Sequence, residues 1–415
     1  MVPLAGISAR FPTLSLAARN VIRHGRRSAI AIGAIAFGTA ALLLAGGFIE
    51  WIFVNFREYS IHSHLGHIQV VRPQDDSAAA DDRRARLLPL DSPSLRAIAA
   101  RPDVQLVDAR LSFSGLASSG DTTLSFIGEG VDPVKDRELS SSMTISAGEP
   151  LAANDVDGII VGEGLAANLG VAPGSKLVLL ATLPSGGISA VEVHVRGIFY
   201  TVTKAYDDVA LRVPTPIALR LTKLGGADRW IVLLKDTDQT PAVLAALRQT
   251  LAGQPLTLRP WWELAEFYNR TVTLFSRQLD VMRVIVGVII VLGISNTMIM
   301  NVLERTWEIG TCMALGTPRR SILAQFVLEG TLLGALGGAL GLAVGVLLAM
   351  AISSIGIPMP PPPGMQHGFN GGILVTLPLA AGALALAVAT ALAASLYPAR
   401  KASRLVIVDA LRHGR

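Results

Sequence analysis

The histidines of "HSHLGH" are the side chains whose type and spacing come closest to those of a metal site. His62 and His64 lie two residues apart, so on a strand their rings share one face, whereas His67 lies on the other face. Imidazole nitrogens are common zinc ligands. The pattern leaves two interpretations open, a metal site and the solvent-exposed start of a strand. We adopt the second and predict no metal site.

The sequence contains no clear motif for metal binding, ATP binding or catalysis. The single cysteine, Cys312, has no second metal ligand nearby. There is no G-x-x-x-x-G-K-[ST] phosphate loop, so we do not expect the chain to bind ATP by that mechanism. There is no G-x-S-x-G nucleophile motif either. We therefore predict no catalytic residues, no cofactor bound by this chain and no enzyme activity of its own.

The composition indicates a membrane protein. Of 415 residues, 51% are hydrophobic and only 16% are charged, against about 25% charged residues in soluble domains. Crossing a bilayer takes about 20 apolar residues, and four segments are long enough: 28–56, 281–303, 321–355 and 373–397. The net charge of +5 does not indicate nucleic-acid binding, because the arginines flank the apolar runs, where membrane topology explains them.

The basic residues predict the orientation of these spans. Lys and Arg gather before the first span, between the second and third, and after the fourth, whereas the loop 356–372 has none. The positive-inside rule then assigns three parts to the cytoplasm: the N-terminal segment 1–27, the loop 304–320 and the tail 398–415. Residues 57–280 and the short loop 356–372 lie outside. The chain is expected to cross a membrane several times with both termini cytoplasmic, and the family resemblance given below implies that this is a bacterial inner membrane.

The external segment 57–280 is expected to be an α+β domain. Its short apolar runs, bounded by Gly, Pro and Asp, predict strands in "HIQVVRP", "DARLSFSGLA", "TTLSFIGEG", "KLVLLAT", "VEVHVRGIF" and "RWIVLLKD". "EGLAANLGVAPG" predicts a short helix closed by Gly170, and "TPAVLAALRQTLAG" a helix with Thr240 as N-cap. The polar stretch 73–86 is expected to be a mobile loop.

The loop 304–320 contains a second short helix. "ERTWEIGTCMALG" has good helix formers, with Gly316 as the stop and Pro318 beyond it. At helical spacing Ile309, Cys312, Met313 and Leu315 group toward one side. Such a helix fits either the groove of a partner protein or a layer of lipid headgroups, and the residues alone leave both open.

Several separated motifs resemble FtsX-like permeases of ABC transporters, a superfamily that includes the macrolide-exporter (MacB) and lipoprotein-releasing (LolC/LolE) types. The resemblance lies in "NTMIMNVLERTWEIGTCMALGTPRRSILAQFVLEG", in "YPARKASRLVIVDALR" and in external-domain stretches such as "GIIVGEGLAANLGVAPGSKLVLL". The order of one span, a large external domain and three further spans also matches. The resemblance covers nearly the whole chain.

The resemblance implies a partner and a mode of action. In that family the loop between the second and third spans forms a coupling helix on the ATPase subunit. Two permease chains, identical or paralogous, assemble with two ATPase copies, and ATP-driven closure is transmitted to the external domain, a mode called mechanotransmission. The matching residues are Glu304, Arg305, Glu308, Ile309, Gly310, Met313, Ala314, Leu315 and Gly316. MacB-type proteins carry a fused ATPase, whereas this chain starts at the first span, so we expect a separate ATPase that binds ATP and Mg²⁺.

Two features of the spans bear on packing and cargo. Glycines of the third span at small-x-x-x-small spacing predict a seam for close helix packing. The end of the first span concentrates apolar and aromatic residues, which either face cargo or form an ordinary aromatic belt. The candidate cargo-facing residues are Phe48, Trp51, Ile52, Phe53 and Leu274.

The expected cargo is a lipoprotein or another amphipathic molecule taken from the inner membrane, with a periplasmic carrier as a further partner. Two alternatives stay open. One is a drug or peptide exporter that works with an adaptor. The other is an FtsX-like regulator of a cell-wall hydrolase.

Overall fold

The computed structural model describes residues 23, 25–73, 83–183, 186–361 and 365–412. The described residues form two compact units. The first, here called the membrane unit, takes residues from 1–53, 272–358 and 370–415. The second, here called the sheet domain, takes residues from 54–271 and 359–369. Most of the stretch predicted as a mobile loop lies outside the described residues, and its end forms the short helix α3 (Arg83–Arg86).

Four helices in the described residues are long and apolar enough to cross a membrane. They are α2 (Gly25–Ser60), α11 (Glu266–Glu304), α13 (Arg319–Ile355) and α14 (Leu377–Ser403). The expected class, four spans with a mixed domain between the first two, is confirmed. Helix α11 begins well before the span predicted at 281, and α14 ends after the span predicted to stop at 397. Two short helices, α12 (Thr306–Ala314) and α15 (Ile407–Arg412), contact each other.

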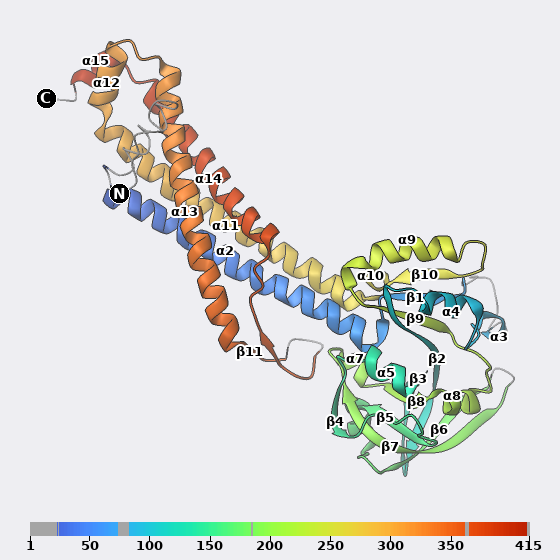
Figure 1. Cartoon of the computed structure of the whole chain (residues 1–415). Helices are drawn as coiled ribbons and strands as arrows, with labels where there is room; N and C mark the ends of the chain where they lie inside the picture. Colours follow the sequence, from blue (N-terminus) through green and yellow to red (C-terminus); the bar gives the residue numbers. More distant parts are fainter. Residues whose placement is uncertain (1–22, 24, 74–82, 184–185, 362–364, 413–415) are drawn as a thin grey trace. The chain divides into compact units, whose positions relative to one another are not determined.

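Glycines set the packing of α13 along two rows, as the spacing predicts. Gly330 and Gly334 face α14, where an added Cβ would lie 2.5 Å from the Ser395 side chain and 2.4 Å from that of Ala391. The other row faces α2, and a Cβ on Gly337 would lie 2.7 Å from Ile35. Real Cβ contacts are longer, so only glycine allows these helices to approach so closely. Figure 1 shows α2, α11, α13 and α14 running alongside one another in this unit.

The sheet domain is built on a ten-stranded mixed sheet. Nine strands follow the order β10-β1-β9-β2-β3-β8-β5-β7-β4, while β6 pairs with β2 and β7. The strands are β1 (Ile68–Val71), β2 (Val104–Ser119), β3 (Thr122–Val131), β4 (Thr144–Gly148), β5 (Gly158–Gly162), β6 (Lys176–Thr182), β7 (Ile188–Tyr200), β8 (Ala210–Pro214), β9 (Arg229–Leu234) and β10 (Thr257–Pro260). Most pairs are antiparallel, but β3–β8 and β5–β7 are parallel. All six predicted strands are present, and β4, β5, β8 and β10 were not predicted.

Short helices cover the sheet. They are α4 (Pro93–Ala99), α5 (Pro133–Leu139), α6 (Glu163–Leu169), α7 (Lys204–Asp207), α8 (Thr215–Thr222), α9 (Thr240–Thr250) and α10 (Trp261–Leu264), with a 3₁₀ turn η4 (Thr237–Gln239). Gly170 ends α6 in the left-handed conformation, as predicted. Thr240 is not the N-cap of α9: Gln239 occupies that position, and the Thr240 hydroxyl donates to the Thr237 carbonyl. A two-stranded sheet, β11 (Ile357–Met359) and β12 (Phe369–Gly371), lies between α13 and α14.

Candidate functional site

The predicted coupling helix is α12, separated from α11 by a single non-helical residue. Helix α11 ends at Glu304, and Arg305 has φ −102° and ψ 12°, outside the helical range, before α12 begins at Thr306. At the other end, Gly316 has a φ of 95°, which ends the helix where the sequence predicts. Pro318 then caps α13. The break allows α12 to take a direction different from that of α11.

One face of α12 is buried inside the membrane unit, which corrects part of the sequence interpretation. Ile309 and Met313 are only 5% and 8% exposed and belong to a cluster with Phe326 of α13 and Ala399 of α14. These two side chains therefore anchor α12 to its own chain and are not free to enter a partner's groove. Gly310 is buried as well.

The opposite face of α12 is exposed and carries a residue that the sequence analysis did not select. Trp307 is 53% exposed and Leu315 is 83% exposed. With Thr311 and Ala314 they follow the i, i+4, i+7, i+8 spacing of a single helix face. Cys312 is also exposed. The grouping of Cys312 and Leu315 with Ile309 and Met313 was therefore wrong, whereas the spacing from Trp307 would have separated the two faces.

Charged residues surround α12. Glu304 pairs with Arg27 of α2, and Glu308 accepts from Arg305 at 3.1 Å. Arg305 also pairs with Glu329 of α13 at 3.4 Å. Glu329 was missed by the sequence analysis, although a carboxylate within an apolar span is itself a signal of function.

The predicted cargo-facing residues do not form one exposed surface. Ile52 is 4% exposed and belongs to the interior. Phe48 and Trp51 lie against Gly371 and Gly372, where an added Cβ would come within 2.9 Å of each ring. Phe53 is half-buried, and Leu274 is 66% exposed. The rings of Phe48 and Trp51 thus pack against the chain segment that precedes α14, so these faces of the rings are not free to contact cargo.

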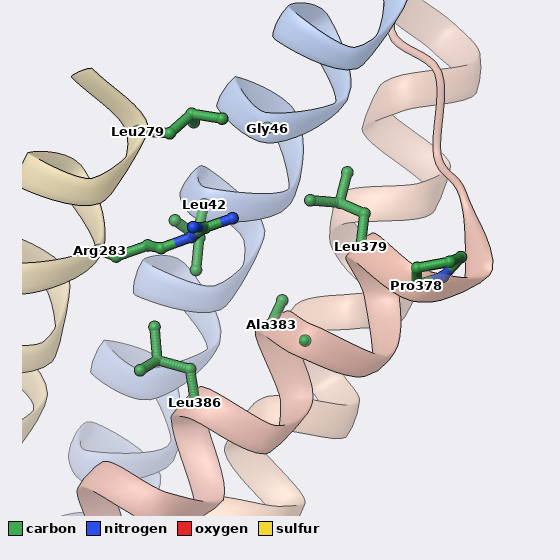
Figure 2. Close-up of a pocket in the computed structure, with 9 residues that line it drawn as sticks. Leu42, Gly46, Leu279, Arg283, Pro378, Leu379, Ala383 and Leu386 are labelled. Atoms are coloured by element: carbon green, nitrogen blue, oxygen red, sulfur yellow. The ribbon is translucent and has the colours of Figure 1, made fainter. Parts of the chain in front are cut away.

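A groove of 220 Å³ lies within the membrane unit among α2, α11 and α14. Figure 2 shows Leu42 and Gly46 on α2 and the side chain of Arg283 reaching from α11 toward α2. The lining residues are Leu42, Gly46, Leu279, Arg283, Pro378, Leu379, Gly382, Ala383 and Leu386. Arg283 is the charged member of this set, and it also pairs with Asp280 at 2.7 Å. The groove therefore offers apolar contact with one cation.

The sheet domain buries a network of six charged side chains, here called the buried ion network: Asp108, Arg110, Glu129, Asp136, Arg212 and Arg229. Arg110 and Arg212 are fully buried. Burial by itself raises the pKa of Glu129, but the three guanidinium groups lower it to about 2. Arg212 donates to Asp136 at 2.8 Å. Pairing with the arginines thus keeps the Glu129 and Asp136 carboxylates ionised.

The buried ion network holds the segment that follows α2. That segment is a π-helix, η2 (Ile61–Leu65), and Arg212 donates to the Ser63 carbonyl at 2.7 Å. The Ser140 hydroxyl donates to the same carbonyl at 3.0 Å, and His64 stacks on Tyr206 at 4.8 Å. The end of the first span is therefore tied to the interior of the domain.

The histidines of this segment correct the expected solvent-exposed strand start. His62 and His64 lie in η2, and His67 is 1% exposed. The Leu234 amide donates to Nδ1 of His67, and Nε2 lies 3.0 Å from the Thr237 hydroxyl. Burial lowers the pKa of His67 to about 3 and that of His64 to about 4. Among the described residues no group of three His, Cys, Asp or Glu side chains could hold a metal ion.

Two family models match two different parts of the chain. The family model for the MacB-like periplasmic core domain matches residues 28–250, and that for the FtsX-like permease C-terminal matches residues 281–407. An uncharacterized ABC transporter permease of Bacillus subtilis, YvrN, is 36% identical over 29% of this chain and 26% of its own length. A macrolide export ATP-binding/permease protein, MacB, of Syntrophobacter fumaroxidans is 28% identical over 51% of this chain and 28% of its own.

Among solved structures, the periplasmic region of MacB from Actinobacillus actinomycetemcomitans aligns with a TM-score of 0.36 and 13% identity, over 51% of this chain and 95% of that one. The two family models together match most of the chain, and the model for the MacB-like periplasmic core domain alone covers more than half of it. The chain spans little more than a quarter of the length of either curated relative. This chain belongs to the family of FtsX-like ABC transporter permeases with a MacB-like periplasmic core domain.

Proposed function

We propose that this chain is the permease subunit of an ABC transporter that receives work from a separate ATPase subunit and passes it to the sheet domain. Membership of a permease family implies an ATPase partner. In this proposal two ATPase copies bind ATP and Mg²⁺, and two permease chains assemble in a bacterial inner membrane. The motion travels along α2 and reaches the domain at η2, where Arg212 and Ser140 hold the Ser63 carbonyl.

The observation that carries this proposal is that α12 has one buried face and one exposed face. One face is fixed in the membrane unit through Ile309 and Met313, while Trp307 and Leu315 remain exposed on the other. An apolar helix face at i, i+4, i+7 and i+8 is suited to a protein groove. An anchored helix transmits a push from its partner to the helices beneath it. We therefore assign the ATPase contact to the Trp307–Leu315 face, with Glu304, Glu308 and Gly316 at its edges.

Substitution of Leu315 tests the docking role. Leu315 is 83% exposed, so Leu315→Asp keeps the fold. If the residue is buried in the complex it contributes about 1.5–3 kcal/mol, so its loss weakens capture of the ATPase about tenfold or more. Co-purification is followed by mass spectrometry for a chain with the G-x-x-x-x-G-K-[ST] motif. Ile355→Asp, at an equally exposed position at the far end of α13, is the matched control. Equal capture by both variants would rule out the docking face.

The topology that this role requires is separately testable. The α12 end must face the cytoplasm, and the sheet domain must lie on the other side. Reporter fusions after Gly316 are expected to read cytoplasmic, and fusions after Gly197 external. An external signal at Gly316 would reverse the topology and remove α12 from the reach of a cytoplasmic ATPase.

For the cargo we propose an amphipathic molecule, with a lipoprotein acyl chain as the first candidate. The groove among α2, α11 and α14 supports this, because it offers apolar contact beside the cation of Arg283. Each buried CH₂ of an acyl chain contributes about 0.8 kcal/mol. A photo-crosslinking residue at Leu379 is expected to capture cargo during turnover, whereas one at Leu336, exposed on α13, is not. Identical phospholipid adducts at both sites, with and without ATP, would exclude the groove as a cargo site.

A second candidate is export of a small amphipathic molecule with an adaptor, and the name of the Syntrophobacter fumaroxidans relative, a macrolide export protein, favours it. The same crosslinking experiment separates the two. A lipidated protein captured at Leu379 supports lipoprotein release. A small molecule captured there supports export.

A further inference from the structure

Four charged side chains of the membrane unit form an alternating series, here called the ion chain: Arg23, Glu308, Arg305 and Glu329. Arg23 Nη1 lies 3.7 Å from Glu308 Oε1, and the other oxygen of Glu308 lies 3.1 Å from Arg305 Nε. Arg305 Nη1 then lies 3.4 Å from Glu329 Oε2. A parallel link joins Arg27 to Glu304. Each carboxylate or guanidinium in the middle of the series has a partner on both sides.

The ion chain runs from solvent into the protein interior. The side chains of Arg23, Glu308, Arg305 and Glu329 are 71%, 42%, 13% and 2% exposed in that order. At the inner end the Asn301 side-chain amide donates to Glu329 at 3.4 Å, while its Oδ1 has no hydrogen-bond partner within the described residues. The Arg305 guanidinium also lies 5.5 Å from the ring centroid of Phe326. The inner pair is thus enclosed but only loosely hydrogen-bonded.

The chain joins elements that must move together in the proposed function. Arg23 and Arg27 stand at the start of the first span, Glu308 on α12, and Glu329 on α13. Arg305 occupies the break between α11 and α12, where backbone hydrogen bonding alone does not fix the direction of α12. A side chain that returns from this break to another helix therefore helps to set that direction, together with the packing of Ile309 and Met313.

We propose that Glu329 is a positioning residue for energy coupling: through Arg305 it fixes the angle of α12, and through Glu308 and Arg23 it ties α12 to the first span. The inference rests on the proposed function and deepens it. A push on the Trp307–Leu315 face then displaces α2 and α13 together. Without the Arg305–Glu329 link only the packing of Ile309 and Met313 holds α12 at the break, so its angle varies more and part of the push is lost.

The position of α12 can be measured without the ATPase, because Cys312 is the only cysteine of the chain and is exposed on α12. A spin label there and a second on Leu336→Cys of α13 report the α12–α13 distance in the full chain reconstituted in lipid. We expect a single narrow distribution for the parent protein and a clearly broader one for Glu329→Gln. Glu266→Gln, which breaks the exposed pair with Arg270, is the control and is expected to stay narrow.

A double variant separates positioning from simple structural support. Glu329→Gln leaves the largely enclosed Arg305 with Glu308 as its remaining carboxylate partner, and the loss of one partner of an enclosed ion pair by itself destabilises a protein. Arg305→Met with Glu329→Leu removes both charges and restores an apolar contact, so it is expected to fold. A structural role predicts parent-like coupling for this double variant. A positioning role predicts that it too has a broad distance distribution and that its stimulated ATP hydrolysis is about tenfold lower, within the usual range of coupling between sites.

Measuring how well each variant captures the ATPase separates the test of Glu329 from the test of the docking face. Glu329→Gln and the double variant are expected to bind the ATPase as the parent does, because the exposed face of α12 is unchanged. A narrow distance distribution in both variants, or full stimulation of hydrolysis in the double variant, would overturn the role of Glu329. Failure of Leu315→Asp to reduce capture would overturn the docking face and leave the distance measurement intact.

Discussion

The sheet domain and the membrane unit both bury arginine–carboxylate pairs, but they do so in opposite ways. In the domain, Arg110 and Arg212 are fully enclosed and each pairs with more than one carboxylate. In the membrane unit, the ion chain has one enclosed end and one solvent-exposed end, and its inner contacts are 3.4 Å long. A buried network in which each arginine has several partners resists rearrangement, because breaking it weakens the pairing of enclosed charges. A graded chain can exchange partners with water from its outer end.

In the proposed function this difference corresponds to two mechanical tasks. The buried ion network holds η2, the segment that follows α2, so in that proposal it serves as a fixed attachment for the end of α2. The ion chain lies beside the exposed face of α12, where a docked partner would have to displace the helix. The following predictions break one side of this comparison at a time, beginning with the largest expected effect.

Arg212→Met removes one of the arginines that pair with Asp136 and Glu129 in the interior of the domain, and also a donor to the Ser63 carbonyl. Removing one partner from a buried ion pair costs about 3–5 kcal/mol, so thermal unfolding of the purified protein is expected at a much lower temperature. Arg96→Met, which breaks an exposed pair with Asp91, is the control and is expected to unfold at the parent temperature. If the two variants unfolded at the same temperature, the network would not be the fixed attachment that we infer.

Met313→Asp tests the buried face of α12. Losing a buried methionine costs about 2–5 kcal/mol, and the added carboxylate has no partner in the apolar cluster around Phe326. Heat-induced loss of the folded, monodisperse fraction in detergent is expected to occur earlier for Met313→Asp than for the parent. Leu315→Asp, on the exposed face, is expected to match the parent in this assay. The reverse order would mean that the two faces of α12 are assigned the wrong way round.

Gly334→Leu tests the close packing of α13 against α14. The new Cβ would lie 2.4 Å from the Ala391 side chain, so the helices must separate. Overpacking of this kind costs about 1–3 kcal/mol. Gly293→Leu on α11 is the matched control, since no atom lies within 4 Å of its added Cβ. Disulfide trapping between cysteines introduced on α13 and α14 should slow only in Gly334→Leu, and unchanged trapping would argue against a glycine seam.

Acidification tests the buried histidine of the domain. Burial lowers the pKa of His67 from 6.5 to about 3, so below pH 6.5 the unfolded chain takes up a proton that the folded chain does not. The free energy of unfolding therefore falls as pH falls, by about 0.8 kcal/mol between about pH 7.5 and about pH 6. His67→Gln removes this contribution, so its melting temperature is expected to change less over that interval. Parallel pH profiles for the two proteins would show that His67 does not contribute.

Much of this architecture was predictable because its causes are local in the chain. The four spans follow from apolar length, the six predicted strands from alternating runs, and the ends of α6 and α12 from Gly170 and Gly316. Two of the unpredicted strands, β5 (Gly158–Gly162) and β8 (Ala210–Pro214), are short and buried along their whole length, so they show no alternation. A third, β4, has no buried residue and likewise shows no alternation. The Thr240 cap failed because η4 precedes α9 and Gln239 takes the cap position.

The residues of the sites were harder to predict. The sequence by itself determined that a short helix stands between the second and third spans and that glycines line the third span. Both follow from residues close together in the chain, because they set hydrophobic periodicity and the points at which a helix ends. Only the tertiary structure decided which face of α12 is free. Ile309 and Met313 turn inward because α13 and α14 offer Phe326 and Ala399 there. It also joined Arg23, Arg305 and Glu329, which are far apart in the chain, since charge pairing across helices depends on distances that only packing sets.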